Sequence, residues 1–192
     1  MSKNKDKLPI VIIEGPSGVG KDSVYSKLIE WYPEQYIKMV SVTSRPARPG
    51  EIDGIHYKFV TTECFEKMIE SGDVFEHTTR HGNYRGMSKE LIDSILKRGL
   101  IPVKDVDLIG LNAIKKTYGS QVFSIFLTAP KKEIIKRLKA RGDSGEDLAV
   151  RIKDYDAKIK EKKYFHTVVK NLVLDDAVKE VHTLIQNFKN KM

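Results

Sequence analysis

The chain has 192 residues, a formal net charge of +8 and 40% hydrophobic residues. That length suits one α/β domain with room for a small insertion, and the apolar content is enough for a buried core. The positive charge favours anionic partners such as nucleotides, nucleic acid or an anionic surface, although solvated faces account for much of it. The single cysteine, Cys64, excludes an internal disulfide and fits a reducing compartment.

The sequence shows no segment for a membrane or for export. No stretch approaches the roughly 20 apolar residues of a membrane span, and the charged residues 1–7 lack the apolar run of a signal peptide. We therefore expect a cytoplasmic protein without a membrane partner.

A short apolar run over residues 8–13 predicts a buried strand, which ends in a glycine-rich loop before Lys21. Apolar residues then recur at helical spacing, at Val24, Leu28 and Trp31. Glycines let backbone N–H groups turn toward an anion, and the helix N-terminus adds its positive dipole end. Lys21 is placed to reach the β- and γ-phosphates of a nucleotide. The alternative interpretation is a structural strand–helix turn that binds no ligand. The residues predicted to bind ATP here are Gly15, Pro16, Ser17, Gly18, Val19, Gly20, Lys21, Asp22 and Ser23.

The loop departs from the common phosphate-loop pattern G-x-x-x-x-G-K-[ST] at its last position. Asp22 stands where a Ser or Thr hydroxyl normally ligates Mg²⁺, and Ser23 comes one residue late. One or two carboxylates are common in Mg²⁺ sites that also use substrate phosphates. We therefore predict Asp22 as a direct or water-mediated ligand of Mg²⁺.

A second strand is expected over residues 36–42, followed by a loop that carries Arg45 and Arg48 among prolines. Proline stiffens such a loop and lowers the entropy cost of holding guanidinium groups in place. Paired arginines suit bidentate capture of phosphate. From these residues alone, a phosphate site and a solvated basic loop are equally good interpretations.

The segment from Thr43 to Phe59 resembles the guanylate kinase motif T-[ST]-R-x-x-[RK]-x-x-[DE]-x-x-G-x-x-Y-x-F. It matches the fixed positions at Thr43, Ser44, Arg45, Arg48, Glu51, Gly54, Tyr57 and Phe59. The resemblance runs from the phosphate loop to the last helix. It implies that Arg45, Arg48 and Tyr57 hold the phosphate of the acceptor, GMP. It also implies that Ser41 faces the guanine.

The resemblance continues through a helix at 62–72 and a strand that begins at 74–76. Glu76 matches the carboxylate that reads guanine N1–H and N2–H₂ in the family. The following segment departs from the family's G-N-Y-Y-G-[ST] in two places. Arg85 replaces a tyrosine that contacts the GMP phosphate, which is a mild change because arginine also binds phosphate. Met87 replaces a hydroxyl that helps to read guanine O6, and a thioether cannot donate a hydrogen bond.

A helix at 88–98 leads to a predicted strand at 100–107, which ends in Asp105 and Asp107. Ligands bind at this end of parallel strands. The segment resembles the family's L-D-I-D, with Lys104 unusual in place of Leu. One acid can hold Mg²⁺ or its waters and the other can face the acceptor, and the residues leave the order open. Our assignment places Asp105 with the metal and Asp107 with GMP.

The last third predicts a helix at 131–140, with Arg137 on its outer side, a glycine-bearing loop at 141–147 and a helix that carries Arg151. The family has a lid here, whose arginines close on the transferred phosphoryl group. Arg137, Arg141 and Arg151 match that pattern, and solvated basic helices are the alternative. A strand is expected at 167–171, and Asn171 matches a family position near the adenine. A helix at 175–189 completes the core.

These α/β elements predict a parallel P-loop sheet with helices on both faces. The resemblance implies an inserted acceptor-nucleotide domain and a helical lid. The predicted division is a core of 1–40, 91–136 and 161–192, an acceptor domain of 41–90 and a lid of 137–160. The predicted activity is ATP-dependent phosphorylation of GMP and dGMP with Mg²⁺. Lys21, Arg45, Arg137, Arg141 and Arg151 would neutralise charge.

Three other functions compete with this one. The Gly-Lys-Asp-Ser ending at 20–23 also resembles ribose 1,5-bisphosphate phosphokinases, although the arginine-rich acceptor motif argues against that acceptor. A non-catalytic guanylate-kinase-like module is disfavoured because the loop keeps its glycines and Lys21. A nucleic-acid-binding role lacks a recognised motif.

Overall fold

The computed structural model describes residues 7–192, and its centre is a five-stranded parallel sheet of order β2-β7-β1-β8-β9. Residues 1–6, most of the charged stretch considered for a signal peptide, lie outside the described part. The strands of this sheet are β2 (Tyr36–Lys38), β7 (Ile101–Lys104), β1 (Ile10–Glu14), β8 (Val122–Thr128) and β9 (Thr167–Lys170).

The central strand β1 is fully buried and its side chains alternate between the two faces of the sheet. Val11 and Ile13 join the core on one face, and Ile10 and Ile12 join the core on the other. A parallel strand that is covered on both faces reads as a continuous apolar run, which is why this segment could be recognised in the sequence.

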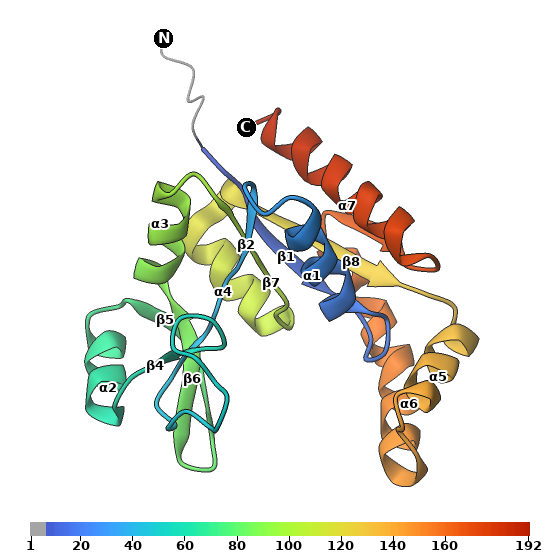
Figure 1. Ribbon diagram of the computed structural model, residues 1–192, viewed down its shortest axis with the longest axis horizontal. Coiled ribbons are helices and arrows are strands. Elements are labelled where there is room, and N and C mark those ends of the chain that lie inside the picture. Colours follow the sequence, from blue (N-terminus) through green and yellow to red (C-terminus); the bar gives the residue numbers. More distant parts are fainter. Residues whose placement is uncertain (1–6) are drawn as a thin grey trace.

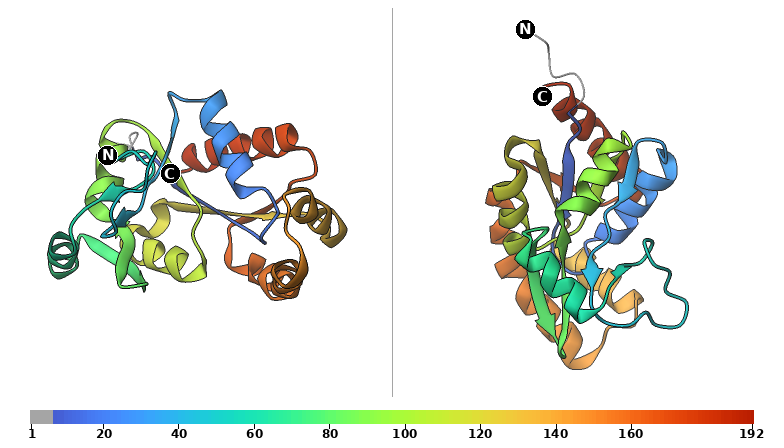
Figure 2. Two further views of the ribbon diagram at one scale, coloured as in Figure 1. Left: turned by 60° about the horizontal axis from the view of Figure 1, so that its bottom comes forward. Right: turned by 90° about the vertical axis from the view of Figure 1, so that its left-hand side faces the viewer.

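Helices cover both faces of the sheet (Figures 1 and 2). On one face α1 (Lys21–Trp31) packs against α7 (Leu174–Lys189), and both supply residues to the first core. On the other face lie α3 (Lys89–Lys97) and α4 (Leu108–Tyr118), which carry the second core. The predicted α/β architecture with helices on both faces is confirmed.

A second, four-stranded sheet projects beyond the core sheet, in the order β4-β3-β6-β5 (Figure 1). Its strands are β3 (Val42–Thr43), β4 (Lys58–Phe59), β5 (Val74–Arg80) and β6 (Asn83–Ser88), and α2 (Thr62–Glu70) packs on it. Its separate small core consists of Val42, Phe65 and Val74. These elements fall within the segment predicted as the acceptor domain.

Two helices, α5 (Lys131–Ala140) and α6 (Gly145–Ile159), project on the other side of the core sheet (Figure 1). Ile134 and Leu138 anchor α5 in the first core, whereas no residue of α6 is buried. Short 3₁₀ turns at Gly119–Gln121 and Lys160–Tyr164 join helices to the strands that follow. The lid predicted at 137–160 thus comprises the end of α5 and α6.

Three predicted strands end differently in the structure. The strand expected at 36–42 is divided, because the chain leaves the core sheet after Lys38 and enters the second sheet at Val42. The strand expected at 100–107 ends at Lys104, because Asp107 caps the next helix by accepting from Gly110 N at 2.9 Å. The last strand ends one residue early, so that Asn171 follows β9.

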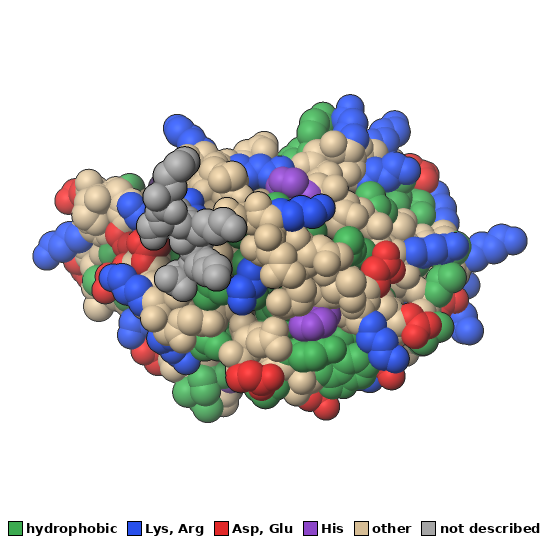
Figure 3. Space-filling view, turned by 90° about the horizontal axis from the view of Figure 1, so that it is seen from above, with side chains coloured by type: hydrophobic (Ala, Val, Ile, Leu, Met, Phe, Trp, Pro, Cys, Tyr) green, Lys and Arg blue, Asp and Glu red, His purple; other side chains and the backbone are tan. Residues whose placement is uncertain are grey.

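The face seen from above the view of Figure 1 shows Lys and Arg side chains spread among acidic and uncharged ones (Figure 3). The net positive charge is therefore not gathered into one patch on this face. Within residues 7–192, no helix is both long and apolar enough to cross a membrane.

The small core of the second sheet should be sensitive to truncation. Phe65 is completely buried and stacks on Tyr84 at 5.1 Å between ring centroids. We expect Phe65→Ala to lower the free energy of unfolding by about 3–5 kcal/mol, as for other buried aromatic residues. Urea unfolding measures this loss. The exposed neighbour Cys64 gives the control, because Cys64→Ala should stay within about 0.5 kcal/mol of wild type. Equal stability of the two variants would contradict the separate core.

Candidate active site

Two cavities open at the carboxyl ends of the core strands, and they share Glu14. One has a volume of about 610 Å³ and is lined mainly by the second sheet and the end of β7. The other, of about 430 Å³, is lined by the glycine-rich loop and α6. Glu14 is the last residue of β1 and lines both. Groups bound in the two cavities would therefore meet beside this strand end.

The glycine-rich loop leads into a helix start that is open to an anion, although Val19 N already donates to the Pro16 carbonyl at 3.1 Å. Helix α1 begins after Gly20, which has a left-handed conformation with φ 94° and offers no side-chain cap. The first N–H groups of a helix need partners from elsewhere, and an anion can supply them. Lys21 donates from Nζ to the Gly15 carbonyl at 2.8 Å, which bends its ammonium back over the loop. This arrangement is suited to holding phosphate groups.

Asp22 lies on the first turn of α1 and accepts a 2.6 Å hydrogen bond from the Tyr25 hydroxyl. Burial raises the pKa of Tyr25, and the charges of Asp22 and Asp105 add to the rise. Asp22 of α1 and Asp105, which follows β7, are therefore both near one phenol hydroxyl. No group of three or more potential metal ligands gathers within the described residues.

The arginines of the lid meet at one carboxylate. Asp143 pairs with Arg141 at 2.7 Å and with Arg151 at 3.1 Å. Arg151 also donates to Ser17 Oγ of the glycine-rich loop at 2.6 Å, which brings α6 over the second cavity. Asp143 thus holds two guanidinium groups together, and that of Arg151 lines the second cavity.

Arg137 and Asn171 both bind the backbone of the glycine-rich loop. The Val19 carbonyl accepts from Asn171 Nδ2 at 2.8 Å and from Arg137 Nη1 at 3.2 Å. Arg137 therefore faces the loop, whereas the sequence analysis placed it on the outer side of its helix. Asn171 is 2% exposed, and its Oδ1 has no hydrogen-bond partner within residues 7–192. A buried acceptor of this kind is suited to a ligand donor.

Glu14 connects the strand end with the lid. Lys158 of α6 pairs with Glu14 at 3.0 Å and with Glu161 at the same distance. Burial raises the pKa of Glu14, and the ammonium groups of Lys21 and Lys158 oppose that rise. The pair fixes α6 against the floor of both cavities.

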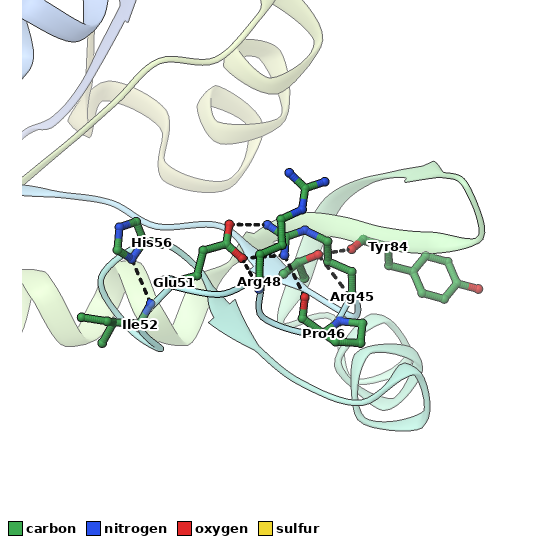
Figure 4. Close-up of polar contacts among 8 residues, drawn as sticks. Arg45, Pro46, Arg48, Glu51, Ile52, His56 and Tyr84 are labelled. Carbon is green, nitrogen blue, oxygen red and sulfur yellow. Dashed lines mark hydrogen bonds and ion pairs between the residues drawn. The ribbon is translucent and has the colours of Figure 1, made fainter.

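In the first cavity, Glu51 organises the arginine loop (Figure 4). Its two carboxylate oxygens accept from Arg45 at 2.6 Å each, and one of them also accepts from the backbone N of Arg48 at 2.8 Å. The Arg45 guanidinium lowers the pKa of Glu51 to about 2, so the pair stays ionised at neutral pH. The loop is therefore arranged before any ligand binds.

The ring of Tyr57 lies near two guanidinium groups. Arg45 and Arg85 each lie 5.1 Å from its centroid, within the range of a cation–π contact. Arg85 also donates from Nε to Ser41 Oγ at 3.4 Å. Arg45 and Tyr57 from the arginine loop and Arg85 from β6 form a cationic corner of the cavity.

The other end of this cavity carries Glu76, Met87, Lys104 and Asp107. The β5–β6 pairing shifts register between Val74 and Glu76, and such bulges re-aim side chains. Burial raises the pKa of Glu76, and the charge of Asp107 adds to it. Burial also lowers the pKa of Lys104 to about 8. A carboxylate and an ammonium group are thus held in one secluded region.

Gly86 is required where β6 passes Glu76. A Cβ atom at this position would lie 2.5 Å from the backbone oxygen of Glu76, closer than real contacts allow. The glycine therefore permits the strand approach that seats Glu76 in the cavity.

The sequence profile described as Guanylate kinase matches residues 7–188. The chain belongs to the guanylate kinase family. Guanylate kinase of Idiomarina loihiensis is 38% identical over 87% of this chain and 79% of the relative. That of Rickettsia bellii is 32% identical over 100% of this chain and 99% of the relative. The crystal structure of guanylate kinase from Anaplasma phagocytophilum has a TM-score of 0.69 at 23% identity, covering 96% of this chain and 87% of that one. At that identity, the structure supports the fold alone.

The structure brings the predicted GMP residues of this guanylate kinase family member into one cavity. All of these predicted residues are among those that line it: Ser41, Arg45, Arg48, Tyr57, Glu76, Arg85 and Asp107. Of the predicted ATP residues, Gly15, Pro16, Ser17 and Lys21 line the second cavity together with Arg151. The remaining ones lie in the loop and the start of α1, or bind its backbone as Asn171 does.

Four residues of the site received no role in the sequence analysis: Glu14, Lys104, Asp143 and Lys158. Asp143 and Lys158 resemble the solvated charges around them, and only the packing of α6 brings them to the site. Glu14 and Lys104 could have been recognised in the sequence, because each is a charged residue at the end of an otherwise apolar strand. A charge at that position of a parallel strand points to the ligand side.

Glu51 should act through Arg45 and Arg48. We expect Glu51→Gln to raise KM for the acceptor nucleotide about 3- to 10-fold and to leave KM for ATP unchanged, because a charge-assisted pair becomes a neutral one. The Glu51 pKa of about 2 means that the Arg45–Glu51 pair stabilises the fold fully at any pH above the pKa of Glu51 in the unfolded chain. This stabilisation is lost only as pH falls through 2. Steady-state kinetics at neutral pH therefore measures an ionised pair. Asp53→Asn is the control, since it breaks only the exposed Lys58 pair of the same loop. An equal rise of both KM values would contradict this role.

Proposed function

We propose that the protein transfers the γ-phosphoryl group of ATP to GMP, and to dGMP, as its family relationship indicates. The observation that supports this most directly is the pair of cavities that share Glu14. One is lined by a phosphate-binding loop and the other by a cationic corner with a buried carboxylate opposite. Donor and acceptor phosphates bound there would meet in line at the end of β1.

In this reaction, an ionised phosphate oxygen of GMP attacks the γ-phosphorus of ATP. A general base is unnecessary, because that oxygen carries no proton at neutral pH. The protein therefore contributes positioning and electrostatic stabilisation. Lys21 and the lid residues Arg141 and Arg151 neutralise charge on the transferred group. Arg137 is assigned to the same group of charge-neutralising residues, because it donates to the Val19 carbonyl of the glycine-rich loop.

The acceptor is held at both ends in this proposal. Arg45, Arg48, Tyr57 and Arg85 bind its phosphate, and within residues 7–192 the Arg48 guanidinium enters no hydrogen bond or ion pair that would compete. The Glu76 carboxylate, likewise without a hydrogen-bond partner among the described residues, accepts from guanine N1–H and N2–H₂. Adenine presents an acceptor at N1, which Glu76 repels.

The donor site would take ATP on the loop residues Gly15 to Ser23, with Asn171 beside the adenine. The buried Oδ1 of Asn171 supports this placement, because it lacks a partner within the described residues. Asp22 and Asp105 fit Mg²⁺, since the charge of each raises the pKa of the Tyr25 hydroxyl, which indicates that both carboxylates are near it. Two carboxylates together with substrate phosphates are enough to bind Mg²⁺. When bound, Mg²⁺ supplies charge neutralisation at the phosphates. Cytoplasmic location and the absence of nucleic-acid partners stay predictions.

An acceptor panel tests the activity. ADP release is measured with GMP, dGMP, AMP, UMP and ribose 1,5-bisphosphate as acceptors. We expect turnover with GMP and dGMP and little with the others. Turnover confined to ribose 1,5-bisphosphate would select the other kinase, and no turnover with any acceptor would select a binding module.

Lys21 should be needed for the chemical step. We expect Lys21→Met to lower kcat at least about 100-fold, as when one electrostatic donor is removed from an active site. Thermal unfolding should change little, because the side chain bonds only to one loop carbonyl. Lys27→Met is the control, because Lys27 lies on the same helix α1 and the change breaks only a part-exposed pair with Asp175 of α7. Wild-type kcat in the Lys21 variant would remove the phosphate-loop argument.

Asp22 should set the metal requirement. Its carboxylate adds negative charge beside the triphosphate, so we expect Asp22→Ser to lower the Mg²⁺ concentration that gives half-maximal rate. Tyr25→Phe is the matched control, because it removes the hydrogen bond to Asp22 and keeps the carboxylate. The same metal dependence in wild type and Asp22→Ser would show that Asp22 serves only Tyr25 and the helix start.

A further inference from the structure

Lys104 is a buried ammonium group with unused donors. It ends β7, is 8% exposed and lines the acceptor cavity. Its Nζ donates to the Met39 carbonyl at 3.1 Å, and within residues 7–192 it has no other hydrogen bond and no ion pair. An ammonium carries three donors, so two remain. Buried polar groups are normally satisfied, and the open side here is the cavity.

The surroundings of Lys104 on balance disfavour its charged ammonium form. Burial and the charges of Arg85 and Lys38 disfavour the ammonium form, and the more favourable charges of Asp105 and Glu76 only partly compensate. A leucine or methionine in this strand would pack without desolvating a charge. The lysine therefore costs stability, and a ligand that uses its donors would explain its presence.

The anchor of Lys104 places it near residues that are proposed to face the base. Met39, whose carbonyl holds the ammonium, precedes Ser41 by two residues, and Ser41 lines the same cavity. Glu76 is close enough for its charge to act on Lys104. Arg45 and Tyr57 make the phosphate corner on the arginine loop. Lys104 thus lines the same cavity as a hydroxyl and a carboxylate that are both proposed to contact guanine.

We propose that Lys104 donates a hydrogen bond to O6 of the acceptor base and selects 6-oxopurines. This inference rests on the proposed function, because it names a further contact in the same site. Lys104 supplies the donor that Met87 lacks, and Met87 instead packs in the core at 3% exposure. The same ammonium opposes adenine, whose 6-amino group presents hydrogen atoms to it. The site therefore combines an attractive contact for one base with a repulsive one for the other.

The test compares nucleotides that differ at position 6. Dissociation constants for GMP, IMP, AMP and ribose 5-phosphate are measured by isothermal titration, using displacement for the weak ligands, with wild type and Lys104→Met. GMP and IMP carry O6, AMP does not, and ribose 5-phosphate has no base. We expect the variant to bind GMP and IMP about 10- to 100-fold more weakly, as for the loss of a hydrogen bond to a charged group. Binding of AMP and ribose 5-phosphate should not weaken.

Two further measurements separate a contact from a structural effect. Lys104→Met should keep KM for ATP and unfold at the wild-type temperature or above, because a buried charge is replaced by an apolar side chain of similar length. Lys38→Met removes a nearby positive charge outside the cavity lining and should leave the GMP-to-AMP ratio unchanged. A changed ratio in the Lys38 variant would show that long-range charge, rather than the Lys104 contact, selects the base.

The outcomes distinguish this inference from the proposed function. If wild type does not phosphorylate GMP, the proposed function fails first. If wild type does so and Lys104→Met binds all four ligands equally less well, Lys104 contacts the phosphate or supports the fold, and the inference is wrong. Unchanged binding of GMP by the variant would overturn it as well. Selective loss of GMP and IMP supports it.

Discussion

The close approach of the glycine-rich loop to the core sheet is the constraint on which the site depends. A Cβ atom on Gly15 would lie 2.4 Å from the Leu127 carbonyl of β8, so only glycine permits this path. Because the loop lies so close, the Val19 carbonyl can accept from both Asn171 and Arg137. The end of β9 and the first lid helix are therefore positioned by the same short turn that would hold the nucleotide phosphates.

The acceptor side depends on order within a loop that has no regular structure for most of its length. Glu51 fixes Arg45 with two hydrogen bonds and fixes the backbone of Arg48 with a third. The arginines thus need little rearrangement when a phosphate arrives, which lowers the entropy cost of binding. A small core of Val42, Phe65 and Val74 supports the second sheet, and Met87 of β6 ties that sheet to the second core of the central sheet.

Three charged residues in the strands favour ligand specificity at a cost in folding stability. Glu14, Glu76 and Lys104 occupy positions where an apolar side chain would pack more favourably, and burial shifts the pKa of each toward its neutral form. Such charges are retained where a ligand or a neighbouring element uses them. Lys158 uses Glu14, and the acceptor base would use the other two. The large apolar cores on both faces of the sheet offset this cost.

The sequence by itself determined the strand–loop–helix at residues 8–31, the helices of the core and the family, because these depend on local periodicity and on a dense motif. Through the resemblance, it also singled out the residues that line the first cavity and are proposed to hold the acceptor. The division of the strand expected at 36–42 and the cap at Asp107 were decided by tertiary structure, since the chain changes sheets there and a helix begins early. The bulge that aims Glu76, the inward turn of Arg137 and the meeting of Asp143 with two arginines depend on packing between distant segments. Local pattern carries no information on such contacts, because the partners are brought together only when the sheets and the lid assemble.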